Sequence, residues 1–176
     1  MESETTTRDA RRQDLPAIAA IYGEAVVNGT GSFELEPPDA TEMAERWRAV
    51  VEARLPWIVA ERSGAVAGFA YAAPFRPRPG YRGTLASSVY VAPSARGQGV
   101  GRLLLDALLR AAEATGARQI VASVGDSANT ASIRLHAAAG FERVGTVNSV
   151  GWKQGRWLDV VYMQRALGRG DSEPLD

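Results

Sequence analysis

The chain has 176 residues, enough for one domain with a sizeable buried core. It carries 20 basic and 20 acidic residues, and this balance argues against a protein that binds nucleic acid or a membrane surface. The absence of cysteine excludes disulfides, thiolate catalysis and cysteine-ligated metals. A single histidine, His136, excludes a multi-histidine centre, so no metal is expected.

Periodicity and turn residues divide the chain into short alternating elements. In chain order, we expect a strand at 5–9, helices at 15–26 and 40–53, strands at 57–61, 65–73 and 84–91, a helix at 101–115, a strand at 118–124, a helix at 129–139, and strands at 141–152 and 156–164. This order predicts one α/β domain with a mixed sheet. Residues 1–4 and the tail at 168–176 are expected to be disordered.

Three local signals refine these elements. Asp14 is the expected N-cap of the first helix, and Gly140 is the expected residue that ends the helix at 129–139. In the helix at 40–53, Met43, Trp47 and Val51 are expected on one side. The polar N-terminus has no apolar segment of a secretory signal, and no apolar run is long enough to span a membrane, so a cytoplasmic location is expected.

A glycine-rich basic turn, SARGQGVGR, joins the strand at 84–91 to a leucine-rich helix. Gly97, Gly99 and Gly101 allow the backbone to turn tightly and to direct its N–H groups toward one anion. The helix N-terminus adds the positive end of its dipole, and Arg96 and Arg102 add full charges. The turn therefore predicts a binding site for a phosphate group, most simply that of a cofactor.

The two common nucleotide motifs do not fit this turn. A dinucleotide fingerprint needs G-x-G-x-x-G, and Leu104 stands where the third glycine should be. The acidic residue that would hold a ribose is also misplaced, because Asp126 lies beyond the expected spacing. A Walker loop needs glycine, lysine and a hydroxyl residue in succession, and the chain has no such sequence. A nucleotide-binding regulatory domain is thus the weakest interpretation.

The pattern Arg96-x-x-Gly99-x-Gly101, directly after a strand, resembles the acyl-CoA pyrophosphate loop of the GNAT superfamily of N-acetyltransferases. A second segment, NTASIRLHAAAGF, resembles the family's next motif. Helical spacing puts Asn129, Ser132 and His136 of that segment on one face. From the residues alone, Asn129 and Ser132 could equally cap the helix, and His136 could be a packing residue.

Further segments, among them FELEPP, PFRPRPGYR and GRWLD, narrow the resemblance. They are similar to the GNAT branch that includes phosphinothricin acetyltransferase and the methionine sulfone and sulfoximine acetyltransferases. The resemblance covers residues 8–167 and implies a single domain at 5–167. It implies a mixed sheet of six to seven strands with about four helices, with the strand before the loop splayed from its neighbour at a bulge.

The resemblance implies acetyl-CoA as cofactor and assigns residues to it. The expected cofactor-binding residues are Val89, Tyr90, Val91, Arg96, Gly97, Gln98, Gly99, Val100, Gly101, Arg102, Asn129 and Ser132. Free backbone groups of Val89, Tyr90 and Val91 are expected to pair with the pantetheine arm. The Val89 N–H is the expected donor to the carbonyl oxygen, where charge develops during acyl transfer.

The catalytic residues implied are Val89, His136 and Glu34. His136, or a water beside it, is expected to protonate the departing thiolate. Close relatives carry a glutamate, a candidate base, three residues before the valine of VYV, and this chain has Ala86 there. Glu34 is the nearest substitute that the family layout offers, although it could also be a solvated loop residue.

An amino-acid-like acceptor carries a carboxylate, which arginines can bind with two hydrogen bonds. The expected acceptor-binding residues are Phe33, Arg76, Arg78, Tyr81, Arg82, Ser88 and Trp157, with Arg76 the best single candidate. Alternatively, these arginines could face solvent on a loop and bind no acceptor. The sequence thus predicts an N-acetyltransferase of a small amino-acid-like amine, expected to be a homodimer as is common in the family. A catalytically impaired acyl-CoA-binding or sensing module is the alternative, because Ala86 replaces the expected acid.

Overall fold

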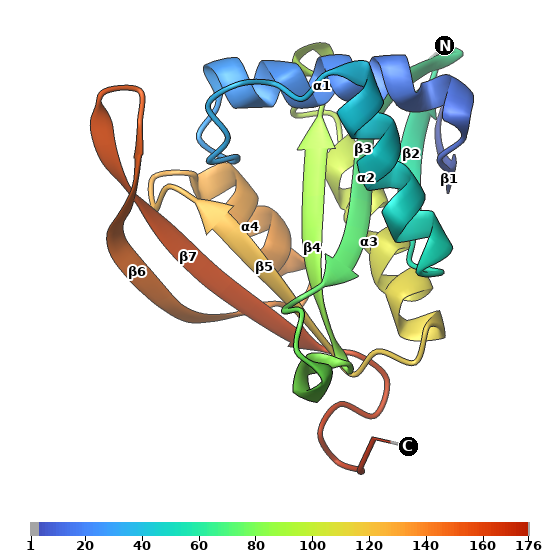
Figure 1. Cartoon of the computed structure of the whole chain (residues 1–176), viewed down its shortest axis with the longest axis vertical. Coiled ribbons are helices and arrows are strands. Elements are labelled where there is room, and N and C mark those ends of the chain that lie inside the picture. The colour runs from blue at the N-terminus through green and yellow to red at the C-terminus, as the bar shows by residue number, and fades with distance from the viewer. Residues whose placement is uncertain (1–3, 176) are drawn as a thin grey trace.

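A mixed seven-stranded sheet with the order β1-β2-β3-β4-β5-β7-β6 forms the centre of the molecule (Figure 1). The structure, a computed structural model, describes residues 4–175. Strand and helix bounds are β1 Thr5–Asp9, α1 Leu15–Asn28, α2 Ala40–Glu52, β2 Trp57–Arg62, β3 Ala65–Pro74, β4 Thr84–Val91, α3 Val100–Ala114, β5 Gln119–Gly125, α4 Thr130–Ala138, β6 Glu142–Lys153 and β7 Arg156–Ala166. The expected order of elements and the mixed sheet are confirmed.

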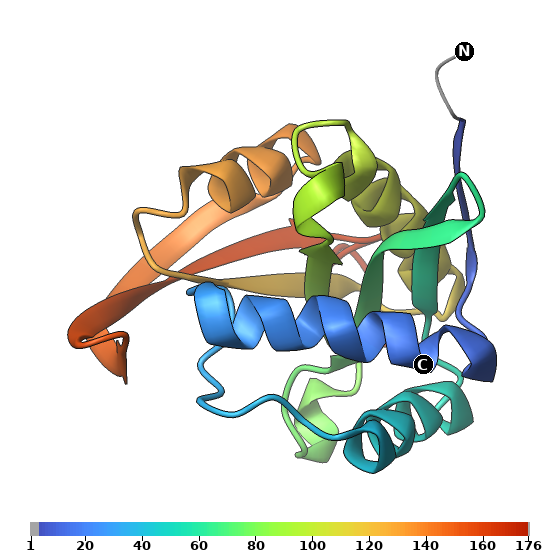
Figure 2. The ribbon, with the colours of Figure 1, turned by 90° about the horizontal axis from the view of Figure 1, so that it is seen from above.

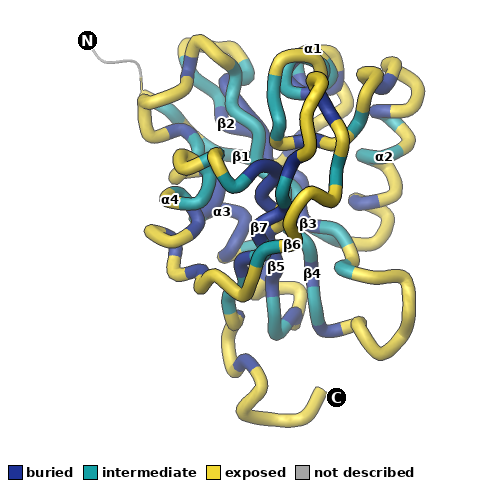
Figure 3. The backbone as a smooth tube through the Cα atoms, turned by 90° about the vertical axis from the view of Figure 1, so that its left-hand side faces the viewer, coloured by how far each residue is buried: buried dark blue, intermediate teal, exposed yellow. Residues whose placement is uncertain are grey.

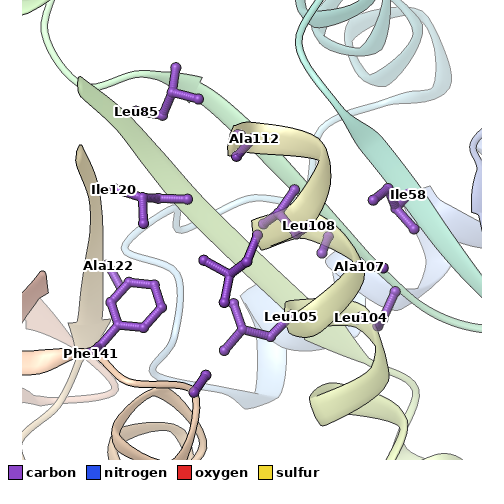
Figure 4. Packing of buried hydrophobic residues seen from close by; sticks show 14 of the residues in the cluster. Ile58, Leu85, Leu104, Leu105, Ala107, Leu108, Ala112, Ile120, Ala122 and Phe141 are labelled. Atoms are coloured by element: carbon purple, nitrogen blue, oxygen red, sulfur yellow. The ribbon is translucent and has the colours of Figure 1, made fainter. Parts of the chain in front are cut away.

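Helices cover both faces of the sheet (Figure 2). The apolar face of α3 supplies Leu104, Leu105 and Leu108, each fully buried, to a cluster that includes Ile120 and Phe141 (Figure 4). A second cluster joins α1 and α2 to the opposite face through Ile18, Met43 and Phe69, among others. Burial of each such side chain stabilises the fold by about 2 kcal/mol, so the two clusters fix the strands that carry the site.

The predicted apolar side of α2 is off by one residue. Met43 is buried as expected, but Val51 is 44% exposed and Val50 is buried at 8%. Seven residues complete about two helical turns, so Val50 lies almost directly above Met43. The eighth residue, Val51, is rotated away from the sheet.

Asp14 does not cap α1, contrary to the prediction. Its backbone is already helical, and its carboxylate accepts hydrogen bonds from the Arg8 guanidinium at 2.7 and 2.9 Å. The same carboxylate accepts from the Arg11 N–H at 2.7 Å. The hydrogen bond from Arg8 lowers the pKa of Asp14 below its usual 3.8, although burial opposes it. Asp14 therefore attaches the start of α1 to β1.

We expect Asp14→Asn to lower the free energy of unfolding at pH 7 by about 2 kcal/mol, because it leaves Arg8 and the Arg11 N–H poorly paired. Because the folded-state pKa is depressed, this stabilisation is present above pH 3.8 and is lost as the pH falls through the folded-state pKa. Urea denaturation at several pH values measures it. Glu61→Gln, at the more accessible partner of Arg8, is the control and should cost less than about 1 kcal/mol. Equal losses in the two variants would contradict the role of Asp14.

The sheet splits between β4 and β5. Parallel pairing joins them only from Thr84↔Gln119 to Ser87↔Ala122, after which β4 stays on β3 and β5 stays on β7. The expected splay is therefore present, but the expected bulge is wrong. The β3–β4 register is constant from Gly68↔Val91 to Pro74↔Leu85, so the strands separate because parallel pairing stops.

The segment after β7 is mostly exposed but makes defined contacts (Figure 3). Arg118 donates to the carbonyl oxygens of Gly170 at 3.2 Å and Pro174 at 3.0 Å. Within residues 168–175 the structure thus shows defined contacts, and the disorder expected for residues 168–176 stays a prediction. The expectation for residues 1–4 falls almost wholly outside the described residues, which begin at Glu4.

Candidate active site

A cleft of about 740 Å³ opens where β4 and β5 separate. Its lining comes from the C-terminal halves of β4 and β5, the glycine turn, the first part of α3, one face of α4 and the end of α1 with the loop after it. Thus the two motifs singled out in the sequence meet at one cavity, although 30 positions separate Gly99 of the first from Asn129 of the second in the chain.

The pairing pattern of β4 directs the backbone groups of alternate residues into this cleft. Hydrogen bonds from Phe75 N to the Thr84 oxygen and from Ala92 N to the Ala67 oxygen show that even-numbered residues of β4 bond to β3. Odd-numbered residues face the other way, so Val89 and Val91 direct their N–H and C=O groups into the gap. Tyr90 lines the cleft, but the free backbone groups expected of it are wrong, because these groups bond to Phe69 of β3.

The same argument identifies two residues on β5 that sequence reasoning missed. Hydrogen bonds from Asp126 N to the Asp159 oxygen and from Leu167 N to the Arg118 oxygen show that even-numbered residues bond to β7. Ser123 and Gly125 therefore direct their backbone groups into the gap opposite Val89 and Val91. A buried apolar strand carries no sequence signal for this, since it depends on where pairing with β4 stops.

The glycine turn adopts the conformation that its sequence requires. Gly97 and Gly99 have φ of 74° and 81°, a region that side-chain-bearing residues rarely adopt. A Cβ added at either glycine would meet no atom within 4 Å, so both border open space. α3 starts directly after Gly99, and its N-terminal N–H groups and dipole face the cleft with Val100 and Gly101.

The charged residues of the turn are held by neighbouring groups. Arg96 pairs with Glu24 of α1 at 2.7 Å and donates to the Val91 oxygen at 3.3 Å. Arg102 pairs with Asp106 at 2.8 Å and donates to the Ala138 oxygen at 2.7 Å. Gln98 donates to the Ser94 oxygen at 2.8 Å, and it is the one predicted cofactor residue of the turn that does not line the cleft.

Asn129, Ser132 and His136 all line the cleft from α4, as helical spacing predicts. Asn129 is also the N-cap, because its side-chain oxygen accepts from the Ser132 N–H at 3.2 Å. Asn129 therefore both caps α4, as one interpretation of the sequence allowed, and lines the cleft. Gly140 follows the helix with φ of 83°, as expected.

The hydrogen bonds of His136 identify its neutral tautomer. Nδ1 lies 2.8 Å from the Ser132 carbonyl oxygen, which can only accept, so Nδ1 carries the proton. The other nitrogen, Nε2, then carries the lone pair. Burial lowers the pKa of His136 below its usual 6.5, and the bond to Ser132 only partly opposes this. At neutral pH the ring is therefore uncharged and can accept a proton at Nε2.

Glu34 lies outside the cleft lining, in a polar cluster between the α1–α2 loop (residues 29–39) and the two helices. It accepts from the Arg46 guanidinium at 2.7 and 3.1 Å and from the Tyr22 hydroxyl at 2.7 Å. Burial alone would raise the pKa of Glu34, but the hydrogen bonds from Arg46 and Tyr22 outweigh it and leave the pKa lowered. These contacts oppose the expected role of Glu34 as a base.

The predicted acceptor arginines lie on the β3–β4 loop, at the opposite end of β4 from the glycine turn (Figure 1). The Arg76 guanidinium lies 5.0 Å from the centre of the Phe75 ring, and Tyr81 packs edge-on against that ring. Arg78 precedes a short 3-10 helix, Pro79–Tyr81, in this exposed loop. Arg82 lines a second cavity of about 980 Å³ between the ends of α2 and α3. Neither these three arginines nor Tyr81 lines the cleft.

The remaining predicted acceptor residues lie in three places: Ser88 in the cleft, Phe33 in the α1–α2 loop outside the cleft lining, and Trp157 in the C-terminal hairpin. Ser88 lines the cleft, with its side chain on the face of the sheet that α1 and α2 cover. The Phe33 ring lies against Gly125, where an added Cβ would come within 3.2 Å of it. Trp157 is 59% exposed and packs edge-on against Trp152 at the tip of the β6–β7 hairpin.

Comparison with known proteins agrees with this arrangement. The Acetyltransferase (GNAT) family profile matches residues 18–141. The chain is 56% identical over 167 residues to phosphinothricin N-acetyltransferase of Alcaligenes faecalis, covering 95% of this chain and 85% of the relative. It is 42% identical to the L-methionine sulfoximine/L-methionine sulfone acetyltransferase of Pseudomonas aeruginosa, covering 95% and 97%. The chain belongs to the GNAT acetyltransferase family.

A solved structure supports the same conclusion for this GNAT acetyltransferase. A phosphinothricin acetyltransferase from Sinorhizobium meliloti, in complex with acetyl-CoA, superposes with a TM-score of 0.94 at 43% identity, over 99% of this chain and 93% of the other. The fold and the enzyme class are therefore those expected, with acetyl-CoA as the acetyl donor. Nothing supports the alternative of an impaired sensing module. In the described part of this acetyltransferase, none of the helices is long and apolar enough to cross a bilayer.

Ala86 leaves the acetyltransferase without a carboxylate at the position where the family resemblance led us to expect one. Its side chain shares a sheet face with Ser88, and it pairs with Ala73 and Val121. Asp126 is the one carboxylate among the described residues that line the cleft. A hydrogen bond from Arg156, with another from the Ala128 N–H, keeps the pKa of Asp126 lowered. Among the titratable groups lining the cleft, only His136 is thus suited to accept a proton at neutral pH.

Proposed function

We propose that this acetyltransferase transfers the acetyl group of acetyl-CoA to the amine of a small amino-acid-like acceptor of the phosphinothricin, methionine sulfone or methionine sulfoximine type. The observation that carries the proposal is the cleft between β4 and β5, with His136 at its wall. The acceptor class is supported by relatives at 42–56% identity that are named for these compounds.

In the proposed complex, the pyrophosphate lies over the turn at Gly97–Gly101, where Arg96 and Arg102 supply charge. The pantetheine arm runs between the separated strands, bonding to backbone groups of Val89 and Val91 and to the Asn129 amide. The free groups of Ser123 and Gly125 border its other side. The Val89 N–H then donates to the thioester oxygen as negative charge develops on it.

The acceptor amine attacks the thioester carbonyl, so that a C–N bond forms and the C–S bond breaks. The amine loses one proton, and the departing thiolate gains one. His136 is suited to both steps, because its neutral Nε2 can take the proton from the amine, directly or through one water. The imidazolium so formed can return the proton to the thiolate, the acid role expected from the sequence.

The acceptor is proposed to approach from the α1 side of the sheet, where Ser88 borders the gap and Phe33 lies at the end of β5. Arg76, the predicted partner of its carboxylate, and the further candidates Arg78, Tyr81, Arg82 and Trp157 lie outside the cleft lining, so their acceptor role stays a prediction. A homodimer is proposed because edge strand β6 and its hairpin expose Val144, Val147, Val150, Trp152 and Trp157. A cytoplasmic location is proposed because the donor is acetyl-CoA.

Release of free thiol from acetyl-CoA, measured against a panel of amines, tests this function. We expect turnover with phosphinothricin, methionine sulfone and methionine sulfoximine, and little with amines that lack an α-carboxylate. Calorimetry with acetyl-CoA alone is the companion measurement. Binding without turnover of any amino acid would contradict the proposed activity and favour a binding module.

A further inference from the structure

The α1–α2 loop is held on one side by a buried ammonium from the β6–β7 hairpin. Lys153, the last residue of β6, is only 4% exposed, and its Nζ donates to the Ser32 carbonyl oxygen at 2.6 Å. Burying a charged group is costly unless it is well paired. The hydrogen bond to Ser32, together with the nearby charge of Glu34, offsets part of this cost and ties the end of β6 to the loop.

Helices α1 and α2 hold the same loop from the other side. The Tyr22 hydroxyl lies 3.1 Å from the Ser32 Oγ and donates to Glu34 at 2.7 Å. Burial first, and then the hydrogen bond to Glu34, raise the pKa of Tyr22 to about 12, so the hydroxyl stays protonated. Arg46 of α2 completes the arrangement through its two bonds to Glu34. The loop is therefore fixed by three separate elements.

Between these attachment points, the loop backbone and Phe33 lie on two glycines. A Cβ at Gly125 would come within 2.1 Å of the Thr30 oxygen, and a Cβ at Gly151 would come within 2.0 Å of the Phe33 ring. Thr30, Gly31 and Gly125 all line the cleft. The segment attached by Lys153 is thus the one that borders the gap on the α1 side.

We propose that Lys153 is a positioning residue for the acceptor, which it affects by holding the α1–α2 loop against the end of β5. This inference rests on the proposed acetyl transfer to an amino-acid-like amine. The cofactor turn and α4 pack on the face of the sheet opposite to α1 and the loop (Figure 2), so most of the proposed acetyl-CoA contacts are separate from Lys153. The acceptor site, bordered by the loop and Ser88, depends on it directly.

Lys153→Met removes the ammonium and keeps a chain of similar length that can fill the space. We expect the acceptor KM to rise about tenfold or more, because small displacements of a positioning group have large kinetic effects. The KM for acetyl-CoA should stay within about twofold, since its proposed contacts are separate. Steady-state kinetics with each substrate varied in turn measures both constants.

A second variant reaches the same loop without touching the lysine. Gly151→Ala places a methyl group where the Phe33 ring now lies, so it should displace the ring and reproduce the same selective rise in acceptor KM. Arg118→Met is the matched control. Arg118 also donates to backbone carbonyl oxygens, those of Gly170 and Pro174, but far from the cleft. Its loss should leave both KM values unchanged.

An unchanged acceptor KM in both variants, with only a lower melting temperature, would overturn the proposal and leave Lys153 a structural role. Parallel rises in both KM values would overturn it as well. Failure of the unaltered enzyme to acetylate any amino acid is a distinct result, which would contradict the proposed function and, with it, an acceptor role for Lys153.

Discussion

Replacing His136 with asparagine is expected to lower kcat by a factor of about 10² or more, because positioned acid–base groups contribute factors of this size. The asparagine amide can still donate to the Ser132 oxygen in place of Nδ1, so α4 should keep its structure. The variant lacks the imidazole Nε2, the nitrogen that accepts the proton. Steady-state thiol release and thermal unfolding, measured together, separate loss of catalysis from loss of folding.

The pH profile gives the second readout for this variant. Burial places the pKa of His136 below 6.5, so in the unaltered enzyme kcat/KM should decline as the pH falls through that lower value. The acceptor amine must also be uncharged to react, so its protonation causes a separate decline in kcat/KM that begins at higher pH. The acidic limb should disappear with His136→Asn, whereas the amine limb should remain. An acidic limb that persists at full kcat would rule out His136 as the base.

Val89→Pro is expected to lower kcat by a factor of about 10² to 10³, the usual loss when one donor to the developing oxyanion is removed. Of the backbone hydrogen-bonding groups of β4, proline removes the N–H of residue 89, which faces the cleft rather than β3, and its ring also restricts φ at this position. The β3–β4 ladder should therefore survive the substitution. Initial rates at saturating concentrations of both substrates measure the effect.

Two controls accompany Val89→Pro. Val89→Thr keeps the backbone donor with a side chain of the same shape and should retain most of the activity. Val91→Pro removes the other cleft-facing N–H of β4, which is proposed to bind the pantetheine arm, and should mainly raise the KM for acetyl-CoA. Equal loss of kcat in the two proline variants would contradict a specific oxyanion role for Val89.

Local signals were sufficient to predict the elements of the fold. Glycines of positive φ, an N-cap asparagine and helical spacing describe the glycine turn and α4, because each feature depends on neighbours within a few residues. The side of β4 that faces the cleft was predicted less well. The prediction of free backbone groups at Tyr90 was wrong. Strand register decides which backbone groups are free, and the sequence does not encode register locally.

The contacts around the α1–α2 loop could not be predicted, because they join residues that are far apart in the sequence. Lys153 and Ser32 lie 121 positions apart, and neither belongs to a recognisable pattern. Asp14 failed as a cap for a similar reason, since Arg8 and Arg11 bind its carboxylate instead. Glu34 was proposed as a base from the family layout alone, and its pairing with Arg46 became visible only in three dimensions.

The early end of the β4–β5 ladder has a mechanical consequence. Among the described residues, only four residue pairs join β4 to β5 within the sheet, with Gly83 adding backbone contacts just before them. A pantetheine arm, which contains amide groups of its own, would lie in the gap as a surrogate strand and bridge the β1–β4 and β5–β7 halves of the sheet. The cofactor would then serve as a removable cross-link, so that acetyl-CoA both supplies the acetyl group and braces the sheet while the acceptor reacts.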